Sequence, residues 1–441
     1  MITRSTEKMK IEVEIISKEI VKPCSPTPQH LRHYHLSFLD QLCPEVNNSW
    51  VYFYDTRTSN LGCIDDDASD HLKKSLSKVL SDYYPLAGKL IDNSFVDCND
   101  DGVPYIETRV RCRLNHVIEN PSPAVVSKLL PYEMDEAVDT LLGVQVNAFD
   151  CCGMAIGVSI SHKVADALSY FQFVKSWAAV SRGEPEQKIR THFQSSSLFP
   201  PKDMSGYNLE FHIDKIVCRR FSFEASVIES LRAKHSEKMK NLLDDEDNQK
   251  PPSRIEVLST FIWTRFQEAT KEEGSRKIHL VAWTVDLRQR MEPPLPEYAF
   301  GNYVWLIRTF PTLDEKGECN DLGMKLREEL NKIDQDFIVK LGEGENQWKA
   351  DQQRSSSGDG EEIVAFAFSS LCRFPVYEVD FGWGNPTWAG PPTWKFKNAV
   401  VFKDAISGGG IEAYVSLAEE DMTKLESDEE FRAHVSTTGL T

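Results

Sequence analysis

The chain contains 441 residues, of which 41% are hydrophobic and 27% are charged, and its formal net charge at pH 7 is -18. Because one ordinary hydrophobic core rarely serves a chain of this length, we expect two domains in a globular protein. The acidic charge and the lack of a basic block argue against nucleic acid as a partner.

No run of about 18 apolar residues occurs, so we expect no helix that spans a membrane. The polar opening MITRSTEKMKIEVEII lacks the apolar core of a signal peptide, which predicts a cytoplasmic location. The ten cysteines form no Cys-x-x-Cys pair, so we expect no metal site. We also expect the protein to be a monomer.

Three elements are predicted in the first half of the chain. In SDHLKKSLSKVLSDYY, apolar residues recur at helical spacing as far as Tyr83, and Pro85 ends the pattern. Between 144 and 161, two alternating runs flank turn residues, which predicts a β-hairpin. A helix is expected to start at about Asp166, because apolar residues at helical spacing follow it.

The stretch 191–211 has neither helical nor strand periodicity and contains a Pro-Pro pair, which is typical of a connection between domains. We therefore expect an N-terminal domain at 1–190, a crossover linker at 191–213 and a C-terminal domain at 214–441.

The second half alternates helices and strands irregularly, which indicates a mixed α/β class. We expect a helix after Ser253, a strand buried on both faces at 277–285, and one long helix through 322–341. The segments AVVFKD and IEAYVSL near the C-terminus predict a second hairpin.

His162 is the first candidate for chemistry, because it ends a predicted strand and stands four residues before Asp166. A neutral histidine can accept a proton near pH 7. Small side chains at Gly157, Ser159 and Ser161 on one strand face would leave room beside it for a ligand. The alternative is a buried, hydrogen-bonded histidine next to an aspartate that caps a helix.

A second candidate stretch is VYEVDFGWGNP at 376–386, where Val376, Glu378 and Asp380 would share one face of a strand. Two glycines bracket Trp383, which implies close backbone contact around the indole. The alternative for Asp380 is a structural carboxylate that accepts backbone N–H groups in a turn.

Two further segments carry charged residues at places suited to anions. Ser253 and Arg254 begin a helix and would suit a phosphate, although the same pattern also forms an ordinary capping box. After the strand at 277–285, an arginine at 288 or 290 would pair with Asp166 or Asp380, or would remain in solvent.

HKVADA and DFGWG, in this order and at this separation, resemble the two signature motifs of the plant BAHD acyltransferases. Further matching segments extend over nearly the whole chain: CSPTPQHLRHYHLSFLDQL, LSKVLSDYYPLAGKL, VDCNDDGVPY, SRIEVLSTFIW, DLRQRMEPPLP and FGN at 300–302. The opening segment and VDCNDDG resemble most the branch that contains acetyltransferases of alkaloid biosynthesis.

This resemblance implies an α/β fold with two similar-sized mixed-sheet domains of the chloramphenicol-acetyltransferase-like type and a channel at their interface. It implies an acyl-CoA-dependent O-acyltransferase that transfers an acetyl group to a hydroxyl of an alkaloid-like plant metabolite, without a covalent acyl-enzyme. Acyl-CoA, expected to be acetyl-CoA, would be a co-substrate, and no permanently bound cofactor is expected. An amine acceptor and a non-catalytic ligand-binding homologue stay open as alternatives.

By the same resemblance, His162 is the catalytic base, and Asp380 is grouped with it although it lies away from the reacting atoms. Asp166 and Arg288 would form a salt bridge that supports the site, together with Trp383. The residues expected to contact acyl-CoA are Ser253, Arg254, Asp286, Ser369 and Ser370.

The chain departs from the family pattern at two places. Cys151-Cys152-Gly153 stands where Cys-Gly-Gly is usual, so we expect the turn to differ, because only glycine adopts positive φ without strain. Ser369-Ser370-Leu371 stands where many relatives have Thr-Ser-Trp. The oxyanion would then be stabilised by Ser369, a backbone N–H group or water.

Overall fold

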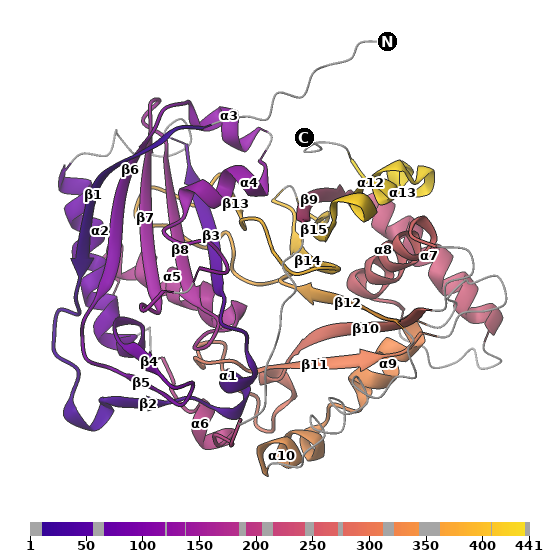
Figure 1. Ribbon diagram of the computed structural model, residues 1–441, viewed down its shortest axis with the longest axis horizontal. Coiled ribbons are helices and arrows are strands. Elements are labelled where there is room, and N and C mark those ends of the chain that lie inside the picture. Colours follow the sequence, from indigo (N-terminus) through magenta and orange to yellow (C-terminus); the bar gives the residue numbers. More distant parts are fainter. Residues whose placement is uncertain are drawn as a thin grey trace.

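Two six-stranded sheets and one three-stranded sheet form the framework of the computed structural model (Figure 1). The residues that it describes are 11–55, 66–119, 121–136, 138–184, 191–204, 215–242, 251–271, 277–311, 322–343, 362–406 and 408–436.

The first large sheet is mixed, because β6 and β7 are parallel whereas its other neighbouring strands are antiparallel. Its strands, in spatial order, are β1 (Val13–Val21), β6 (Val103–Val110), β7 (Leu142–Phe149), β8 (Met154–Ser161), β3 (Asn47–Tyr54) and β13 (Trp388–Gly390). The predicted hairpin at 144–161 is confirmed as β7 and β8.

The second large sheet is also mixed, since β12 is parallel to both β10 and β14. Its strands, in spatial order, are β11 (Val304–Thr309), β10 (Lys277–Asp286), β12 (Glu362–Ser370), β14 (Ala399–Asp404), β15 (Ile411–Ala418) and β9 (Ile216–Phe223). The C-terminal hairpin is confirmed as β14 and β15. The expected mixed-sheet α/β class is therefore correct.

We expected all residues after 214 to belong to the C-terminal domain. Strand β13 does not follow this division, because it pairs with β3 at the edge of the first sheet. The segment that leads to it buries Leu371, Val379 and Phe381 in the core of the first half. The second half therefore contributes a segment to the first sheet and its core, and the gold trace beside β3 shows this segment (Figure 1).

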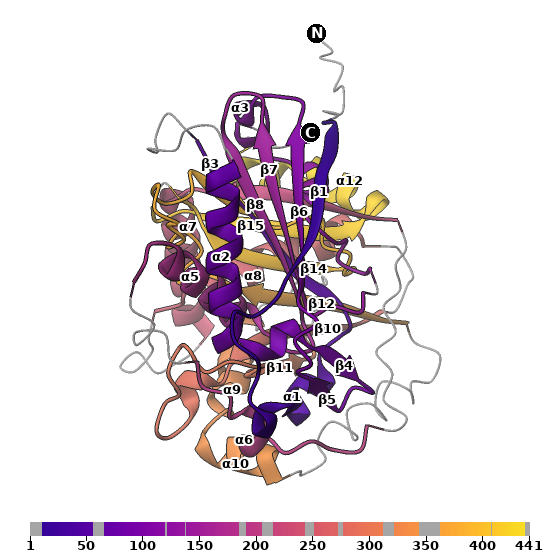
Figure 2. The same cartoon turned by 90° about the vertical axis from the view of Figure 1, so that its left-hand side faces the viewer.

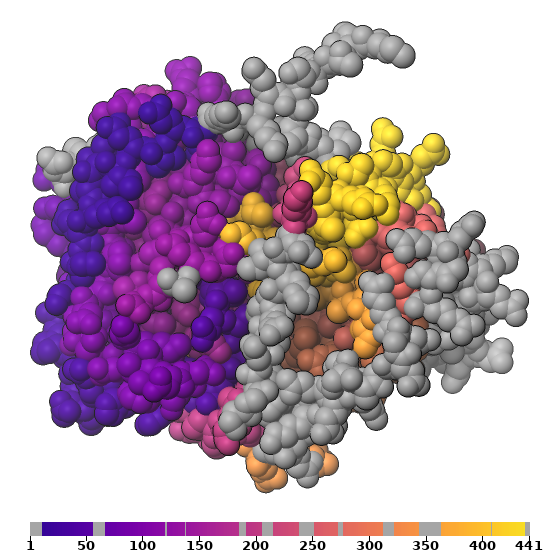
Figure 3. Space-filling view, in the orientation of Figure 1, coloured from indigo at the N-terminus to yellow at the C-terminus, as the bar shows by residue number. Residues whose placement is uncertain are grey.

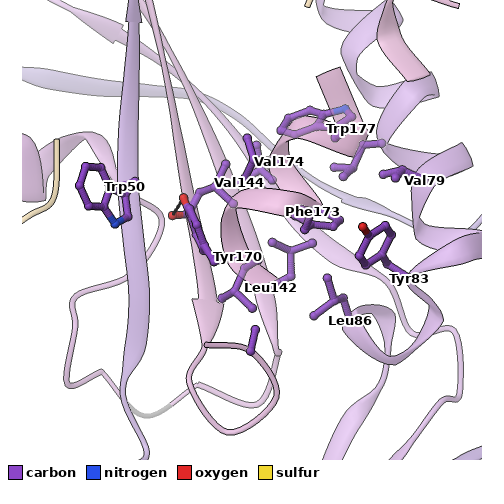
Figure 4. Close-up of a cluster of buried hydrophobic side chains, with 14 of the residues drawn as sticks. Trp50, Val79, Tyr83, Leu86, Leu142, Val144, Tyr170, Phe173, Val174 and Trp177 are labelled. Carbon is purple, nitrogen blue, oxygen red and sulfur yellow. Dashed lines mark hydrogen bonds between the residues drawn. The ribbon is translucent and has the colours of Figure 1, made fainter. Parts of the chain in front are cut away.

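Helices α2 (Asp66–Asp82) and α5 (Ala167–Ser181) cover one face of the first sheet, and Figure 2 shows α2 along the strands. Their apolar faces meet the sheet in a close-packed cluster that includes Tyr83, Val144 and Phe173 (Figure 4). Two buried polar groups of this cluster are hydrogen-bonded: the Trp177 indole donates to Ser75, and the Tyr170 hydroxyl donates to the Val158 carbonyl. The opposite face is covered by α3 (Leu114–Ile118), α4 (Pro123–Val126) and a 3-10 turn at Ser127–Leu129.

One face of the second sheet is covered by helices whose apolar residues form a separate core. The helices of this half are α7 (Ala225–Leu242), α8 (Arg254–Ala269), α9 (Leu322–Asn331), α10 (Gln335–Glu343), α12 (Glu419–Ser427) and α13 (Glu429–His434). In the described part of the chain, no helix has both the length and the apolar character needed to cross a bilayer.

A third, smaller sheet lies below the first in Figure 1. Its strands are β2 (His33–His35), β5 (Phe95–Asp97) and β4 (Lys89–Ile91). The short helix α1 (Phe38–Leu42) follows β2, and α6 (Ser195–Leu198) lies in the segment expected to connect the domains.

Two predicted elements are wrong. The helix expected through 322–341 is broken at 332–334, because Asp334 caps a new helix by accepting from the Phe337 N–H group at 2.8 Å. The strand expected at 376–380 is instead a series of turns. Val376 and Val379 are both buried, and their separation of three residues does not fit the alternation of a strand.

Candidate active site

The face of the second sheet that carries no helices is covered only in part by the first half. Val401 on β14 and Tyr414 on β15 pack into the core of the first half. On β10 and β12 the same face holds Thr284, which is exposed, and Ser369, which is half-buried. The expectation that the strand at 277–285 is buried on both faces is therefore wrong. The surface is recessed between the two halves (Figure 3).

His162 directly follows β8 and begins a tight turn that ends at α5. Its backbone N–H group donates to the Val46 carbonyl at 2.8 Å, which fixes the end of the strand. Asp166 then caps α5 by accepting from the Ser169 N–H group at 2.9 Å. The turn therefore has a fixed backbone at both ends, with the imidazole between them.

Asp166 forms a two-pronged ion pair with Arg288, in which the nitrogen–oxygen distances are 2.8 and 3.0 Å. Only 2% of the Asp166 side chain and 1% of the Arg288 side chain are exposed. Burial alone would raise the pKa of Asp166, but the Arg288 charge and backbone N–H groups outweigh it and hold this pKa below its usual value. Both carboxylate oxygens are thus occupied by structural partners.

The imidazole of His162 contacts Asn302, which is fully buried. His162 Nδ1 lies 3.1 Å from Asn302 Oδ1, and Asn302 Nδ2 donates to the His162 carbonyl at 2.8 Å. Asn302 Nδ2 also donates to Asp40 Oδ1 at 2.8 Å. Asp40 in turn accepts from the Asn302 N–H group and from Ser37.

These contacts determine which imidazole nitrogen carries the proton. The His162 carbonyl can only accept, so the group of Asn302 that faces it is the NH2 group. Asn302 Oδ1 must then face His162 Nδ1, and an oxygen acceptor requires that Nδ1 carries a hydrogen. In the described part of the chain Nε2 has no hydrogen-bond partner, so its lone pair is available.

Burial lowers the pKa of His162 below its ordinary value, although Asp166 and Asn302 act in the opposite direction. The ring is therefore neutral near pH 7, as a proton acceptor must be.

The small residues on β8 do not leave the space that we expected beside His162. A Cβ atom at Gly157 would lie 2.1 Å from the Leu129 carbonyl oxygen, so the glycine admits the backbone of a neighbouring turn. Ser159 is buried and accepts a hydrogen bond from Ser49 at 2.8 Å. The inference of a void on this face is wrong, although His162 itself is only half-buried.

Asp380 lies in the DFGWG turn, where its carboxylate accepts hydrogen bonds from the backbone of the same turn. Its Oδ1 atom accepts from the N–H groups of Gly382 and Gly384 at 2.8 and 2.7 Å. Both glycines have positive φ, 115° and 106°, which explains why glycine is needed there. The ring of Trp383 stacks on Phe381 at a centroid distance of 5.5 Å.

The DFGWG turn is also distant from His162. It is held at the C-terminal end of α5, where Arg182 donates to the Asp380 carbonyl and Ser181 donates to the Phe381 carbonyl. Asp166 caps the other end of this 15-residue helix, and a helix of that length spans roughly 22 Å. We therefore correct the grouping of Asp380 with the catalytic residues, because it shapes a turn.

Three of the residues expected to contact acyl-CoA lie at the ends of neighbouring strands. Asp286 ends β10 and contacts both the N–H group and the guanidinium of Arg288 at 3.1 Å. Burial raises the pKa of Asp286, although the Arg288 charge opposes that rise. Ser369 accepts from Thr284 at 2.8 Å, and Ser370 accepts from the Cys372 N–H group at 3.3 Å.

The other two expected contacts lie at the start of α8. Ser253 and Glu256 form a capping box, which is the structural alternative that the sequence left open. Arg254 pairs with Asp404 at 2.9 Å, and the other oxygen of Asp404 accepts from the Arg373 N–H group at 2.6 Å. Asp404 thus joins the start of α8 to the segment that follows β12.

The Cys151-Cys152-Gly153 turn adopts positive φ at Cys152, 65°, despite the side chain. The N–H group of Cys152 donates to the Phe149 carbonyl at 3.0 Å, which closes the turn. We expected a different turn here, but the structure does not bear this out, because Cys152 adopts the left-handed backbone that a glycine would favour.

The sequence did not reveal the roles of Asp40, Asn302, Asp404 and Thr284. The pattern Ser37-x-x-Asp40 is a capping-box signal that was available, but it does not indicate that Asp40 also binds Asn302. FGN at 300–302 was noted as a motif without a role. Gly301 in it has φ 133° and lies against Ser195, so this position requires glycine.

Comparisons with known proteins agree with this architecture. A model of the Transferase family matches residues 11–432. Limonoid 21-O-acetyltransferase of Citrus sinensis is 37% identical, over 97% of this chain and 99% of its own length. Stemmadenine O-acetyltransferase of Catharanthus roseus is 35% identical, over 95% and 97%. The crystal structure of vinorine synthase matches with a TM-score of 0.80 and 34% identity, over 97% of this chain and 99% of that one.

The chain therefore belongs to the Transferase family, and the resemblance to the BAHD acyltransferases is confirmed. It is a BAHD-type acyltransferase with the fold of vinorine synthase.

Proposed function

We propose that the protein transfers an acetyl group from acetyl-CoA to a hydroxyl group of a plant specialised metabolite, with His162 as the general base. The observation that carries this proposal is the orientation of His162, whose Nδ1 is bonded to Asn302 while Nε2 is left to accept a proton.

In the proposed reaction His162 Nε2 takes the proton of the acceptor hydroxyl as its oxygen attacks the thioester carbon. The C=O electron pair moves to the carbonyl oxygen and gives a tetrahedral oxyanion. When this intermediate collapses, the C–S bond breaks and the imidazolium protonates the departing CoA thiolate. No acyl-enzyme forms, and a base in this position supplies about 10²–10⁴ in rate.

We assign the supporting roles as the contacts suggest. Asp166 and Arg288 hold the turn that carries His162, and Trp383 supports the DFGWG turn at the far end of α5. We propose that acyl-CoA binds along one side of the second sheet. The residues proposed to contact it there are Ser253, Arg254, Asp286, Ser369 and Ser370. Binding both substrates in one channel would lower the entropic part of the barrier.

The names of the relatives favour an alcohol over an amine as the acceptor. Limonoid 21-O-acetyltransferase and stemmadenine O-acetyltransferase are both named for transfer to oxygen, the first on a limonoid and the second on an alkaloid. By extension, we propose that this protein acetylates the hydroxyl group of an alkaloid-like or limonoid-like alcohol. Because His162, Asn302 and Arg288 come from one chain, a monomer suffices for the site. The cytoplasmic location stays a prediction.

The test is to incubate the protein with acetyl-CoA and a panel of stemmadenine, a limonoid with a free 21-hydroxyl, and amine analogues of both. We expect mass spectrometry to find an added acetyl group on an alcohol and an equal amount of released CoA. Acetylation of the amines alone would overturn the assignment to oxygen. If every member of the panel remains unmodified while the protein consumes no acetyl-CoA, the proposal of acetyl transfer fails.

A further inference from the structure

We propose that Asp40 is a positioning residue for the base. Acting through Asn302, its carboxylate fixes the hydrogen on His162 Nδ1 and stabilises the imidazolium that forms during the reaction. This inference rests on the proposed function and deepens it, because it names a residue outside the two motif turns that supports His162.

Asp40 divides its two carboxylate oxygens between a helix cap and the site. It is the third residue of α1, and its side chain is fully buried. Its Oδ2 atom accepts from the N–H group and the hydroxyl of Ser37 at 2.8 and 2.6 Å, which completes a capping box. Its Oδ1 atom accepts from the N–H group and the side-chain NH2 group of Asn302, both at 2.8 Å. The cap therefore uses one oxygen, and the other is committed to Asn302.

These donors favour the charged form of Asp40. A carboxylate has about four acceptor sites, and Ser37 and Asn302 direct two hydrogens to each oxygen. Burial raises the pKa of Asp40, and the hydrogen bonds from Ser37 and Asn302 oppose this rise. Because a proton on either oxygen would have to displace one of these donors, we expect Asp40 to be a carboxylate at pH 7.

Asp40 differs from Asp166 in its charged partners. The charge of Asp166 is paired with Arg288 at 2.8 Å, whereas no residue in the described ranges forms a salt bridge with Asp40. A buried charge without a partner is costly. Protonation of His162 during the reaction supplies a positive charge at the other end of Asn302. The imidazolium therefore gains a stabilisation that the neutral ring does not have, and such a difference lowers a barrier.

Asn302 connects the carboxylate to the imidazole. Its Nδ2 atom donates to Asp40 Oδ1 and to the His162 carbonyl, both at 2.8 Å, so its Oδ1 atom faces His162 Nδ1 at 3.1 Å. Asp40 thus opposes rotation of the amide, which would present NH2 to Nδ1 and select the other tautomer. Donation to a carboxylate also polarises the amide and makes its oxygen a stronger acceptor.

The other titratable groups that face Asp40 and His162 do not take over this role. They are Lys163 and Asp166 in the HKVAD turn, Cys43 after α1, Tyr34 on β2 and Tyr303. The Lys163 Nζ atom donates to the Gln41 carbonyl at 3.1 Å. Burial raises the pKa of the Cys43 thiol and of both phenols, so these three groups are neutral near pH 7.

No proton moves to Asp40 in the reaction. As the acceptor oxygen attacks the acyl carbon, its proton passes to His162 Nε2, and the ring becomes positively charged while Nδ1 keeps its hydrogen. When the C–S bond breaks, Nε2 gives this proton to the departing thiolate, and the ring is neutral again. Asp40 therefore contributes while the imidazolium exists.

The first test is the pH dependence of kcat in Asp40→Asn, which removes the charge and keeps the shape of the side chain. CoA release from acetyl-CoA is measured per folded molecule, with the acceptor that wild type acetylates, from about pH 5 to 8. We expect kcat at the upper end to fall about tenfold. The acidic limb should move by about 0.5 unit to lower pH, because the loss of a nearby negative charge lowers the pKa of the imidazolium. KM for acetyl-CoA should stay within about twofold, since Asp40 acts on the base.

Asn302→Ser tests the connection without changing the capping box of α1. It should move the acidic limb in the same direction as Asp40→Asn. Because Asp40 acts through Asn302, the double variant Asp40→Asn/Asn302→Ser should have the kcat and the acidic limb of Asn302→Ser alone. Asp428→Asn is the matched control. Asp428 caps α13 by accepting from the Phe431 N–H group at 2.6 Å, so this change removes a helix-capping charge and should alter neither quantity.

The inference is overturned if the acidic limb of Asp40→Asn coincides with that of wild type, since a purely structural role would lower kcat without moving the limb. It is also overturned if the double variant loses the product of the two single effects. If Asp40→Asn does not fold, an unmoved limb in Asn302→Ser overturns it alone. His162→Ala separates this failure from that of the proposed function. An inactive His162→Ala beside a wild-type-like Asp40→Asn keeps the base and removes the role of Asp40, whereas an unchanged His162→Ala removes both.

Discussion

The two motif turns of this protein differ in how their polar side chains are hydrogen-bonded. In the HKVAD turn, Asn302 contacts Nδ1 of His162, and among the residues that the structure describes none is hydrogen-bonded to Nε2. In the DFGWG turn, Asp380 gives its carboxylate to the N–H groups of Gly382 and Gly384. Asp380 shapes its own turn at the far end of α5 from His162, whereas a histidine held at one nitrogen can use the other to move a proton.

Both turns anchor helix α5, although only one of them carries a base. They hold opposite ends of α5, with Asp166 as its N-cap and the DFGWG turn against Ser181 and Arg182. Helix α5 crosses the core of the first half, as its side chains in Figure 4 show. Damage to the second turn should therefore affect stability more than chemistry.

The largest loss of stability is expected from breaking the ion pair behind the first turn. Arg288→Met should reduce the free energy of unfolding by about 3–5 kcal/mol, because it leaves the buried Asp166 carboxylate without its charged partner. Urea unfolding measured by circular dichroism tests this. Arg219→Met is the matched control, since its pair with Glu426 is about one-third exposed and should contribute less than about 1 kcal/mol. Equal effects of the two changes would contradict a structural role for Asp166.

A smaller effect on stability but a specific effect on rate is expected at Asn302. Asn302→Leu removes the acceptor of His162 Nδ1, so the inactive tautomer becomes populated, and kcat should fall at least about tenfold per folded molecule. The fully buried Asn147 provides the control, because it donates to the Leu129 carbonyl, in the turn beside the first sheet, and to the Ala155 carbonyl on β8. Asn147→Leu should destabilise the fold without changing kcat of the folded fraction. A normal kcat in Asn302→Leu would show that the tautomer needs no support.

Asp380→Ala is expected to reduce the free energy of unfolding by about 1–2 kcal/mol, because two backbone N–H groups lose their acceptor. The kcat of the folded protein should stay within about twofold of wild type. Asp380→Asn keeps an acceptor oxygen and should cost less stability. A loss of kcat as large as that of His162→Ala would restore Asp380 to the catalytic group.

The smallest expected effect is the change of kcat with pH. Because burial lowers the pKa of His162, the base is neutral throughout the range above its ordinary value near 6.5. We expect kcat to change less than about twofold between pH 7 and 8 and to fall only as His162 becomes protonated at lower pH. The pH dependence of kcat in overlapping buffers measures this. An acidic limb centred above pH 7 would contradict the direction of the pKa shift.

The sequence predicted those parts of the fold in which neighbours along the chain determine the structure. Both hairpins follow from strict alternation, and the start of α5 follows from the capping aspartate at 166. His162 was identified only with the help of the family motifs, since a histidine four residues before an aspartate occurs by chance. The pairing of Asp166 with Arg288 likewise came from the resemblance.

The remaining parts of the site depend on contacts between distant residues. His162 and Asn302 are 140 residues apart, and Asn302 and Asp40 are 262 apart, so no local pattern links them. Gly157 suggested a void because the sequence does not show the Leu129 carbonyl that fills it. Thr284 lies in an apolar run that predicts a buried strand, and only the gap between the two halves makes it exposed.

The most direct test of the central claim is the rate of CoA release from acetyl-CoA by His162→Ala in the presence of the acceptor that wild type acetylates. Asp380→Ala serves as the parallel variant from the second turn. We predict a loss of about 10²–10⁴ in kcat per folded molecule for His162→Ala, and a nearly normal kcat for Asp380→Ala. A His162→Ala variant that releases CoA and forms acetylated product at the wild-type rate would contradict the account.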